Sequence, residues 1–166
     1  MAFVCTIEAT WAQGAGFNWS GESALIAGIG HDDEQPISYS LVVSLEPVPG
    51  EVEFKFYLVA DNQLTSQDQM FWSGRDTGFI VGHDRARVMK AAMAAAHLLV
   101  DHCRPDRFFM ITHDSDLPPK ALVKSELFCK VFTNVGYRIS ETFSHHGKVW
   151  WQMERVDHAD VSDETN

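Results

Sequence analysis

A long segment in which apolar and polar residues alternate limits what this chain can fold into. In ISYSLVVSLEPVPGEVEFKFYLVAD, residues 37–61, nearly every second position is apolar, which is the period of a half-buried β-strand. Pro47, Pro49 and Gly50 suit a turn, because proline presets one backbone dihedral and glycine accepts a positive φ. The segment therefore predicts a long antiparallel hairpin. Its alternating apolar residues are Ile37, Tyr39, Leu41, Val43 and Leu45, followed by Val52, Phe54, Phe56 and Leu58.

The segment TGFIVGHDRARVMKAAMAAAHLLVDHC, residues 77–103, changes to a helical period. Residues 77–81 predict a short strand, and residues 84–102 predict a helix because apolar side chains recur every three or four positions. Its many alanines allow a close approach to a sheet. The predicted buried stripe contains Val88, Ala92, Ala95 and Leu99, with Met89, Met93, Ala96 and Val100 beside it.

A strand and a second helix are predicted next. DRFFMITHD, residues 106–114, carries apolar side chains on both faces, which favours a central strand. In the helix that follows, Asp116 or Ser115 is predicted to cap the N-terminus, the two prolines suit the first turn, and Gly136 ends the helix. The predicted buried stripe of this helix is Ala121, Ser125, Phe128, Phe132 and Val135.

Two further segments complete the predicted fold. YRISETF and KVWWQMERV alternate around SHHG and predict a terminal hairpin, with Tyr137, Ile139, Val149, Trp151 and Met153 on its inner face. Residues 2–11 alternate as a strand does, whereas the glycine-rich residues 12–35 predict no definite element. We therefore expect a single α+β domain over residues 1–156, with a mixed, largely antiparallel sheet and two main helices. Residues 157–166 predict an acidic disordered tail.

Composition excludes several classes of partner. The chain has 166 residues, with 13 Lys plus Arg against 23 Asp plus Glu, so its formal charge is −10. Such an excess of negative charge disfavours electrostatic binding to nucleic acid or anionic lipid. The sequence contains neither a signal-peptide pattern nor an apolar run long enough for a membrane span, which predicts a cytoplasmic protein. Cys5, Cys103 and Cys129 are widely spaced and odd in number, which favours reduced thiols.

The order of elements over residues 77–156 resembles the C-terminal half of the GCN5-related N-acetyltransferase (GNAT) fold. The resemblance covers about half of the chain and rests on strand, helix, strand and helix, then the segments FTNVGYRI and VWWQMER. It implies that the hairpin at 37–60 supplies the two antiparallel strands before this half. Because one fold carries many activities, the resemblance by itself does not imply acetyl transfer.

The positions on which GNAT activity depends are altered here. The coenzyme loop of the family has the pattern Gln/Arg-x-x-Gly-x-Gly/Ala at a helix start, where backbone N–H groups hold the pyrophosphate. The resemblance puts Val81 at the first position and Asp84 at the glycine, and only Ala86 fits. We expect Asp84 to cap the helix, an interaction worth about 1 kcal/mol, and so to occupy the N–H groups that a phosphate needs.

Two further catalytic positions of the family are also altered. The tyrosine that protonates the departing thiolate corresponds to Phe132, and a phenyl ring has no proton to give. Residues 77–81 contain no glutamate to serve as the general base. We therefore predict no catalytic residues and no bound cofactor. An alternative reading has acetyl-CoA held by Gly82, His83, Arg85, Ala86 and Arg87.

Other candidate sites are weighed against structural roles. His113, Asp114 and Asp116 have the side chains of a divalent-metal site at the end of a strand, but Asp and Ser before a helix are more simply caps. AGIG, residues 27–30, is a GxG without the third glycine or the helix of a dinucleotide site. Trp150 and Trp151 are predicted to point to opposite faces of one strand, so one of them is a candidate contact for a partner. Trp72, in a polar loop, is a third such candidate, with a place in the core as the alternative.

The sequence thus predicts a non-catalytic binding or interaction protein on a GNAT-like scaffold. We expect it to be a bacterial or phage accessory factor that presents acidic and aromatic surface to a protein partner, and a homodimer is compatible with this reading. The alternative is an acyl-CoA-dependent N-acyltransferase with a divergent pyrophosphate loop.

Overall fold

A computed structural model of the chain describes residues 2–7, 18–19, 23–72 and 76–156. The predicted tail at 157–166 lies outside these residues. The elements, in chain order, are β1 (Phe3–Cys5), β2 (Asn18–Trp19), β3 (Ala24–Asp32), β4 (Ile37–Val48), β5 (Glu51–Asn62), β6 (Gln67–Phe71), α1 (Gly82–Cys103), β7 (Arg107–Ile111), α2 (Pro119–Asn134), β8 (Tyr137–His145) and β9 (Lys148–Arg155).

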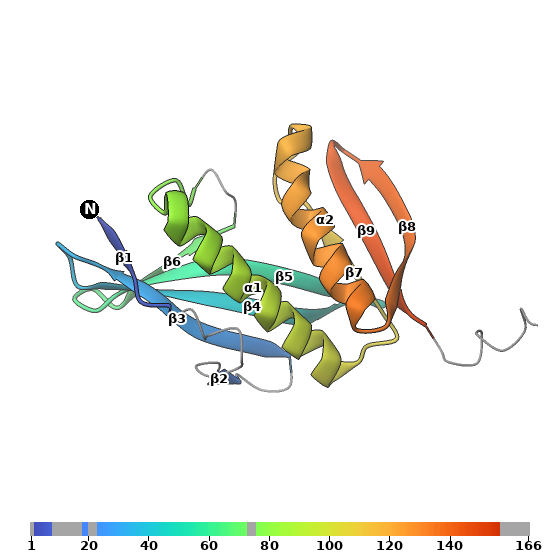
Figure 1. Cartoon of the computed structure of the whole chain (residues 1–166), viewed down its shortest axis with the longest axis horizontal. Coiled ribbons are helices and arrows are strands. Elements are labelled where there is room, and N and C mark those ends of the chain that lie inside the picture. Colours follow the sequence, from blue (N-terminus) through green and yellow to red (C-terminus); the bar gives the residue numbers. More distant parts are fainter. Residues whose placement is uncertain (1, 8–17, 20–22, 73–75, 157–166) are drawn as a thin grey trace, which may run out of the picture.

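The described strands form one mixed sheet with both helices on the same face (Figure 1). The strand order is β1-β3-β4-β5-β7-β9-β8, while β2 pairs with β3 and β6 pairs with β5. Among these pairs, β5 and β7 run parallel and the others are antiparallel. The predicted fold class, α+β with a largely antiparallel mixed sheet and two main helices, is confirmed.

The predicted long hairpin is formed by β4 and β5. Its register runs without interruption from the Ile37↔Asn62 pair to the Val48↔Glu51 pair. Gly50 closes the turn with a φ of 83°, a conformation that glycine adopts without steric cost. The inner face of β4 is buried at Tyr39, Leu41, Val43 and Leu45.

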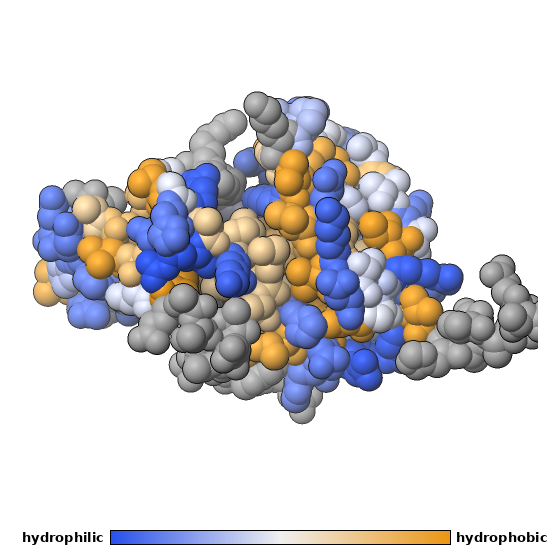
Figure 2. Space-filling view, in the orientation of Figure 1, coloured by the Kyte–Doolittle hydropathy of each residue, from blue (hydrophilic) through white to orange (hydrophobic). Residues whose placement is uncertain are grey.

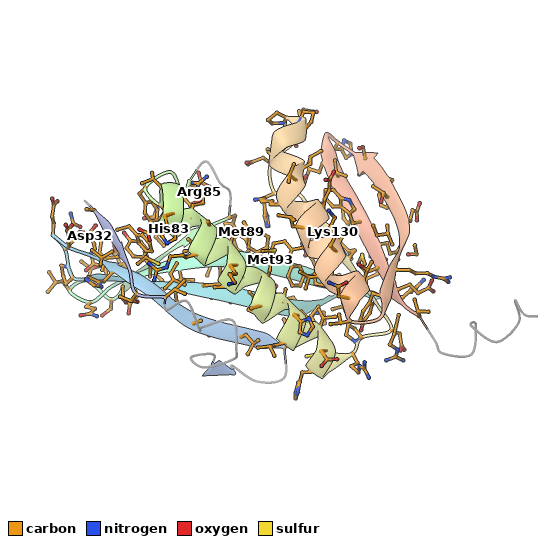
Figure 3. All side chains as sticks on the ribbon, viewed as in Figure 1. Asp32, His83, Arg85, Met89, Met93 and Lys130 are labelled. Atoms are coloured by element: carbon orange, nitrogen blue, oxygen red, sulfur yellow. The ribbon has the colours of Figure 1, made fainter. Side chains whose placement is uncertain are left out.

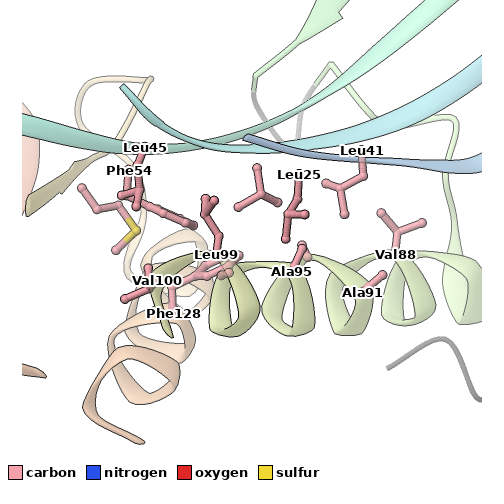
Figure 4. Close-up of a cluster of buried hydrophobic side chains, with 14 of the residues drawn as sticks. Leu25, Leu41, Leu45, Phe54, Val88, Ala91, Ala95, Leu99, Val100 and Phe128 are labelled. Atoms are coloured by element: carbon pink, nitrogen blue, oxygen red, sulfur yellow. The ribbon is translucent and has the colours of Figure 1, made fainter. Parts of the chain in front are cut away.

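Helix α1 packs on β3 and β4 through small side chains. The four alanines Ala91, Ala92, Ala95 and Ala96 are each at most 2% exposed. Because alanine extends no further than Cβ, the helix lies close to the sheet, and Leu25, Leu41 and Leu45 fill the space between them (Figure 4). The predicted helix at 84–102 is confirmed, and it extends from Gly82 to Cys103.

The strand predicted at 77–81 is wrong. Residues 76–79 form turns, and Ile80 is anchored there with 3% of its surface exposed. The strand lies earlier, at β6, where the sequence suggested only a polar link. β6 pairs with β5 through backbone groups from Leu58↔Phe71 to Asn62↔Gln67 while most of its side chains are exposed. An exposed edge strand needs no apolar alternation, which is why the pattern missed it.

The glycine-rich segment for which no element was predicted contains β3, a nine-residue strand. The GxG of AGIG lies inside it. Gly30 pairs with Cys5 where β1 lies very close to β3, since a Cβ at Gly30 would overlap the carbonyl oxygen of Val4 and the ring of Phe3. The register between β3 and β4 shifts between Gly28 and Gly30, and this bulge hides the two-residue period from a sequence reading.

The C-terminal half follows the predicted order. In α2, Ser125, Phe128 and Phe132 are buried as predicted, and the chain leaves the helix at Gly136 with a φ of 92°. β8 and β9 form the terminal hairpin, with Tyr137, Trp151 and Met153 in the core. Ile139 does not belong to this inner face, because it is 45% exposed. A register shift between Ile139 and Glu141 breaks the alternation on which that prediction relied.

The structure tests three further predictions only in part: those for the N-terminal strand, the cysteine thiols and a membrane-spanning helix. The N-terminal strand predicted at 2–11 is described only as β1, and residues 8–11 lie outside the described part. Cys5, Cys103 and Cys129 are free thiols, and burial raises the pKa of Cys129 to about 11. Neither α1 nor α2 has the combination of length and apolar character that a membrane-spanning helix requires.

The close approach of β1 to β3 at Gly30 gives a testable prediction. Gly30→Ala should lower the free energy of unfolding by about 1–3 kcal/mol, because β1 must move away to admit the methyl group. Gly28→Ala is the matched control, since a Cβ there meets nothing within 4 Å. Urea unfolding of both variants measures the difference, and equal stabilities would contradict the described contact.

Candidate functional site

A cleft opens where β5 changes partners. β4 pairs with one edge of β5 along its whole length. On the other edge, β7 pairs at Glu53↔Phe109 and β6 pairs from Leu58 to Asn62. No described strand pairs with residues 54–57 on that edge. The sheet is therefore interrupted beside β5, and a cleft of about 500 Å³ lies at the interruption between α1 and α2.

The cleft is largely apolar, and its volume is within the range of small-molecule sites. Both faces of β5 contribute to it, because Phe54, Phe56 and Leu58 alternate with Lys55 and Tyr57 along this strand. Apolar surface is visible between the two helices, bordered by hydrophilic side chains (Figure 2). Its other apolar residues are Leu41, Phe71, Ile80, Val88, Met89, Ala92, Met110, Ile111, Leu117, Pro118 and Ala121.

Three rings make one wall of the cleft. Tyr57 and Trp72 have ring centroids 4.2 Å apart, and Trp72 lies 4.9 Å from the ring of His113. These residues come from β5, from the end of β6 and from the segment after β7, so the wall joins the two sides of the interruption. Trp72, predicted as a contact for a partner, therefore lines the cleft.

The polar lining carries more positive than negative charge. Lys55, Arg85 and Lys124 face a single carboxylate, that of Asp114, among the charged residues of the lining. Lys55 pairs with Glu46 at 2.7 Å and with Glu53 at 3.2 Å, both outside the lining. The excess of cations in the lining of this cleft contrasts with the net charge of −10.

Arg85 and Lys124 are held in different ways. Arg85 donates from Nε to the carbonyl of Ile80 at 3.0 Å and from an NH2 group to the carbonyl of Thr77 at 2.8 Å. These bonds fix the guanidinium at the first turns of α1, where Figure 3 shows it near Met89. The ammonium of Lys124 lies 5.4 Å from the centroid of the Phe56 ring, a cation–π contact across the cleft.

Burial changes the ionisation of the cleft residues. Burial lowers the pKa of His113, and the charges of Lys124 and Lys148 lower it further. The pKa of Lys124 is also lowered, first by burial and then by Arg85, against the opposing effect of Asp114. Burial raises the pKa of Tyr57. The cleft thus disfavours each of these charged forms, as an apolar environment does.

The predicted cap at the start of α1 is wrong. Val81 is the N-cap and makes no side-chain cap hydrogen bond, so Asp84 does not occupy the capping position. Asp84 is the third residue of the helix, and its carboxylate accepts a hydrogen bond from Arg87 at 3.2 Å. It pairs with the side chain one turn later instead of turning back to the helix end. Of the residues in the alternative acetyl-CoA reading, Arg85 lines the cleft, whereas Gly82, His83, Ala86 and Arg87 are not part of its lining.

The caps predicted for α2 are also wrong. α2 begins at Pro119 with Pro118 as its N-cap and no side-chain cap, and of the two prolines Pro119 occupies the first turn as predicted. The preceding segment is held by the β8–β9 turn, because Ser115 Oγ donates to the carbonyl of His146 and the Asp116 N–H donates to the carbonyl of Gly147.

The side chains that could form the alternative metal site, His113, Asp114 and Asp116, do not converge on one point. The carboxylate of Asp116 lies against Gly147, whereas the ring of His113 lies against Trp72. Among the described residues, no group of three or more His, Cys, Asp or Glu side chains is arranged to hold a metal ion.

Trp150 and Trp151 lie on opposite faces of β9, as predicted. Trp151 belongs to the core and is 6% exposed, so it does not offer a contact to a partner. Trp150 stacks on Phe109 at 4.9 Å and on Phe143 at 5.7 Å, and its buried indole N–H has no hydrogen-bond partner among the residues that the structure describes. Of this pair, Trp150 alone remains a candidate contact.

Comparisons of the chain with protein-family models, curated proteins and solved structures found no match. The resemblance to the GNAT fold therefore stays a prediction.

Sequence reasoning missed Lys124 as a cleft residue. Its signal is present, because Ala121, Lys124, Ser125 and Phe128 follow the spacing of one helix face. A lysine on the helix face that otherwise packs into the core indicates that its charge is at least partly buried. No such signal is present in the sequence for Lys55 and Tyr57. They alternate with the apolar residues of β5, and the sequence predicted only the apolar face of this strand to be buried.

The lowered pKa of His113 predicts a loss of stability in acid. In the unfolded chain the imidazole takes up a proton near its ordinary pKa of 6.5, whereas the folded chain binds that proton only at a lower pH. Stability is thus complete above about pH 6.5 and falls as the pH drops below it. His113→Gln should reduce the loss between pH 7.5 and pH 5.5 in urea unfolding. His97→Gln, at an exposed position of α1, is the control, and equal losses in all three proteins would contradict the assignment.

Proposed function

We propose that this protein is a non-catalytic binding protein that holds a small molecule with an apolar body in the cleft between α1 and α2. The observation that carries the proposal is the interruption of the sheet beside β5, which exposes apolar side chains in a cavity of about 500 Å³. A packed interior leaves few voids larger than a water molecule. A cavity of this size with an aromatic wall therefore suits a ligand better than it suits a purely structural role.

The absence of catalysis is supported by the residue at one family position. The resemblance makes Phe132 the counterpart of the proton donor. Its side chain is completely buried and packs against Phe54 and Phe108, each at a centroid distance of 4.9 Å. Phe132 is not part of the cleft lining. The GNAT-like scaffold, the protein partner and the bacterial or phage origin stay predictions from the sequence.

An acyl-CoA-dependent N-acyltransferase is the second candidate, and one observation favours it. The first turn of α1 has no side-chain cap, and Arg85 lies beside it in the cleft. The N–H groups at a helix start attract phosphate. The prediction that Asp84 blocks them therefore no longer argues against a coenzyme.

A titration with acetyl-CoA separates the two candidates. For the non-catalytic binding protein we expect no rise in unfolding temperature at millimolar acetyl-CoA, and no release of free thiol when amines are added. A rise that Arg85→Met abolishes, together with thiol release, would favour the acyltransferase and overturn the first candidate.

Filling the cleft should abolish binding of an uncharged apolar probe. N-phenyl-1-naphthylamine fluoresces in apolar surroundings, and we expect it to bind the wild-type protein. Ala121→Trp places a large side chain in the cleft lining, so the affinity for the probe should fall by about tenfold or more. Fluorescence titration measures this affinity.

Val123→Trp is the matched control for this experiment. Val123 is on the same helix, is 48% exposed and does not line the cleft, so this variant should bind the probe like the wild type. Urea unfolding of both variants shows whether each is folded. A folded Ala121→Trp variant that binds the probe as well as the wild type does would contradict binding in the cleft.

A further inference from the structure

The ammonium of Lys124 is a charge in the cleft without an anionic partner in the described part of the chain. Lys124 lies on the helix face that also carries Ser125 and Phe128, and its side chain is half-buried. Its described contact is with the ring of Phe56. A buried ammonium is stabilised when a carboxylate pairs with it, and it is costly when none does.

The other two cations of the lining already have partners. Lys55 is paired with Glu46 and Glu53, and Arg85 donates to the carbonyl groups of Thr77 and Ile80. Asp114 acts on Lys124 through its charge, but no ion pair between the two is formed. Lys124 is thus the cation of the lining for which the described residues provide neither an ion pair nor a hydrogen-bond acceptor.

The position of this charge relative to the apolar lining defines the ligand further. Met89 of α1 and Ala121 and Leu117 near the start of α2 line the same cleft as Lys124. A ligand with one anionic end and one apolar body would place the first at Lys124 and bury the second among these side chains. The ammonium of Lys124 can pair with a carboxylate as a point charge, whereas the planar fork of Arg85, which would suit a phosphate monoester better, already donates to two backbone carbonyl groups.

We propose that the ligand of this cleft is a monocarboxylate with an apolar body, and that Lys124 binds its carboxylate. This inference rests on the proposed function, because it names the chemical class of the small molecule held in the same cleft. An amine of the same size is disfavoured, since Lys55, Arg85 and Lys124 outweigh Asp114 in the lining.

Three ligands with the same eight-carbon chain test the proposal. Octanoate, octanamide and octylamine are each titrated against N-phenyl-1-naphthylamine bound to the wild-type protein at pH 7.5. Octanoate should displace the probe at a concentration about tenfold lower than octanamide, because only the carboxylate pairs with the ammonium. Octylamine should be the weakest of the three.

Variants of α2 locate the charge that is responsible. Lys124→Met keeps the length and apolar character of the side chain, so it should weaken octanoate by about tenfold and leave octanamide within about twofold. Lys124→Arg should retain the preference for octanoate. Lys130→Met is the matched control, because Lys130 is exposed on the same helix (Figure 3) and does not line the cleft.

The outcomes distinguish this inference from the proposed function. Equal affinities for octanoate and octanamide in the wild type, or an equal loss of both in Lys124→Met, would overturn the carboxylate proposal while the apolar cleft stands. If the probe itself fails to bind, the proposed function loses its support, and calorimetric titration of octanoate and octanamide makes the same comparison directly. If Lys124→Met does not fold, the wild-type ligand series decides.

Discussion

The edge of β5 that faces away from β4 determines the shape of this protein. β4 pairs with one edge of β5 without interruption, whereas β6 and β7 divide the other edge between them. Neither strand is paired with residues 54–57 on that edge, and helices cover the sheet on one face only (Figure 1). The same interruption places Phe54 and Phe56 of β5 in the lining of the cleft. The strand topology and the cleft thus have one physical origin.

The distribution of charge gives the cleft a character opposite to that of the chain. The net charge of −10 describes the whole sequence. It argues against polyanionic partners only at those surfaces that are themselves negatively charged. Inside the cleft, three cations face one carboxylate. A low-dielectric environment strengthens such local interactions relative to distant, screened ones. We therefore expect the proposed ligand to respond to Lys124 and its neighbours more than to the acidic exterior.

Local patterns predicted the elements well wherever one face of an element is buried. The alternation of β4 and β5 and the alanine stripe of α1 were sufficient for this reason. The patterns failed where pairing does not depend on side-chain burial, as in β6, and where a bulge shifts the period, as in β3. The caps failed for a related reason, since Asp84, Ser115 and Asp116 each found a partner other than a helix N-terminus.

The sequence by itself determined the class of fold, the β4–β5 and β8–β9 hairpins, the two helices and the buried faces of β4, α1 and α2. These features follow from the periodicity of neighbouring residues, which any isolated segment displays. Only the tertiary structure decided where a ligand fits, because Tyr57, Trp72, His113 and Lys124 come from four segments that are distant in the sequence. Their proximity depends on two strands dividing one edge of β5, and no local pattern encodes that arrangement.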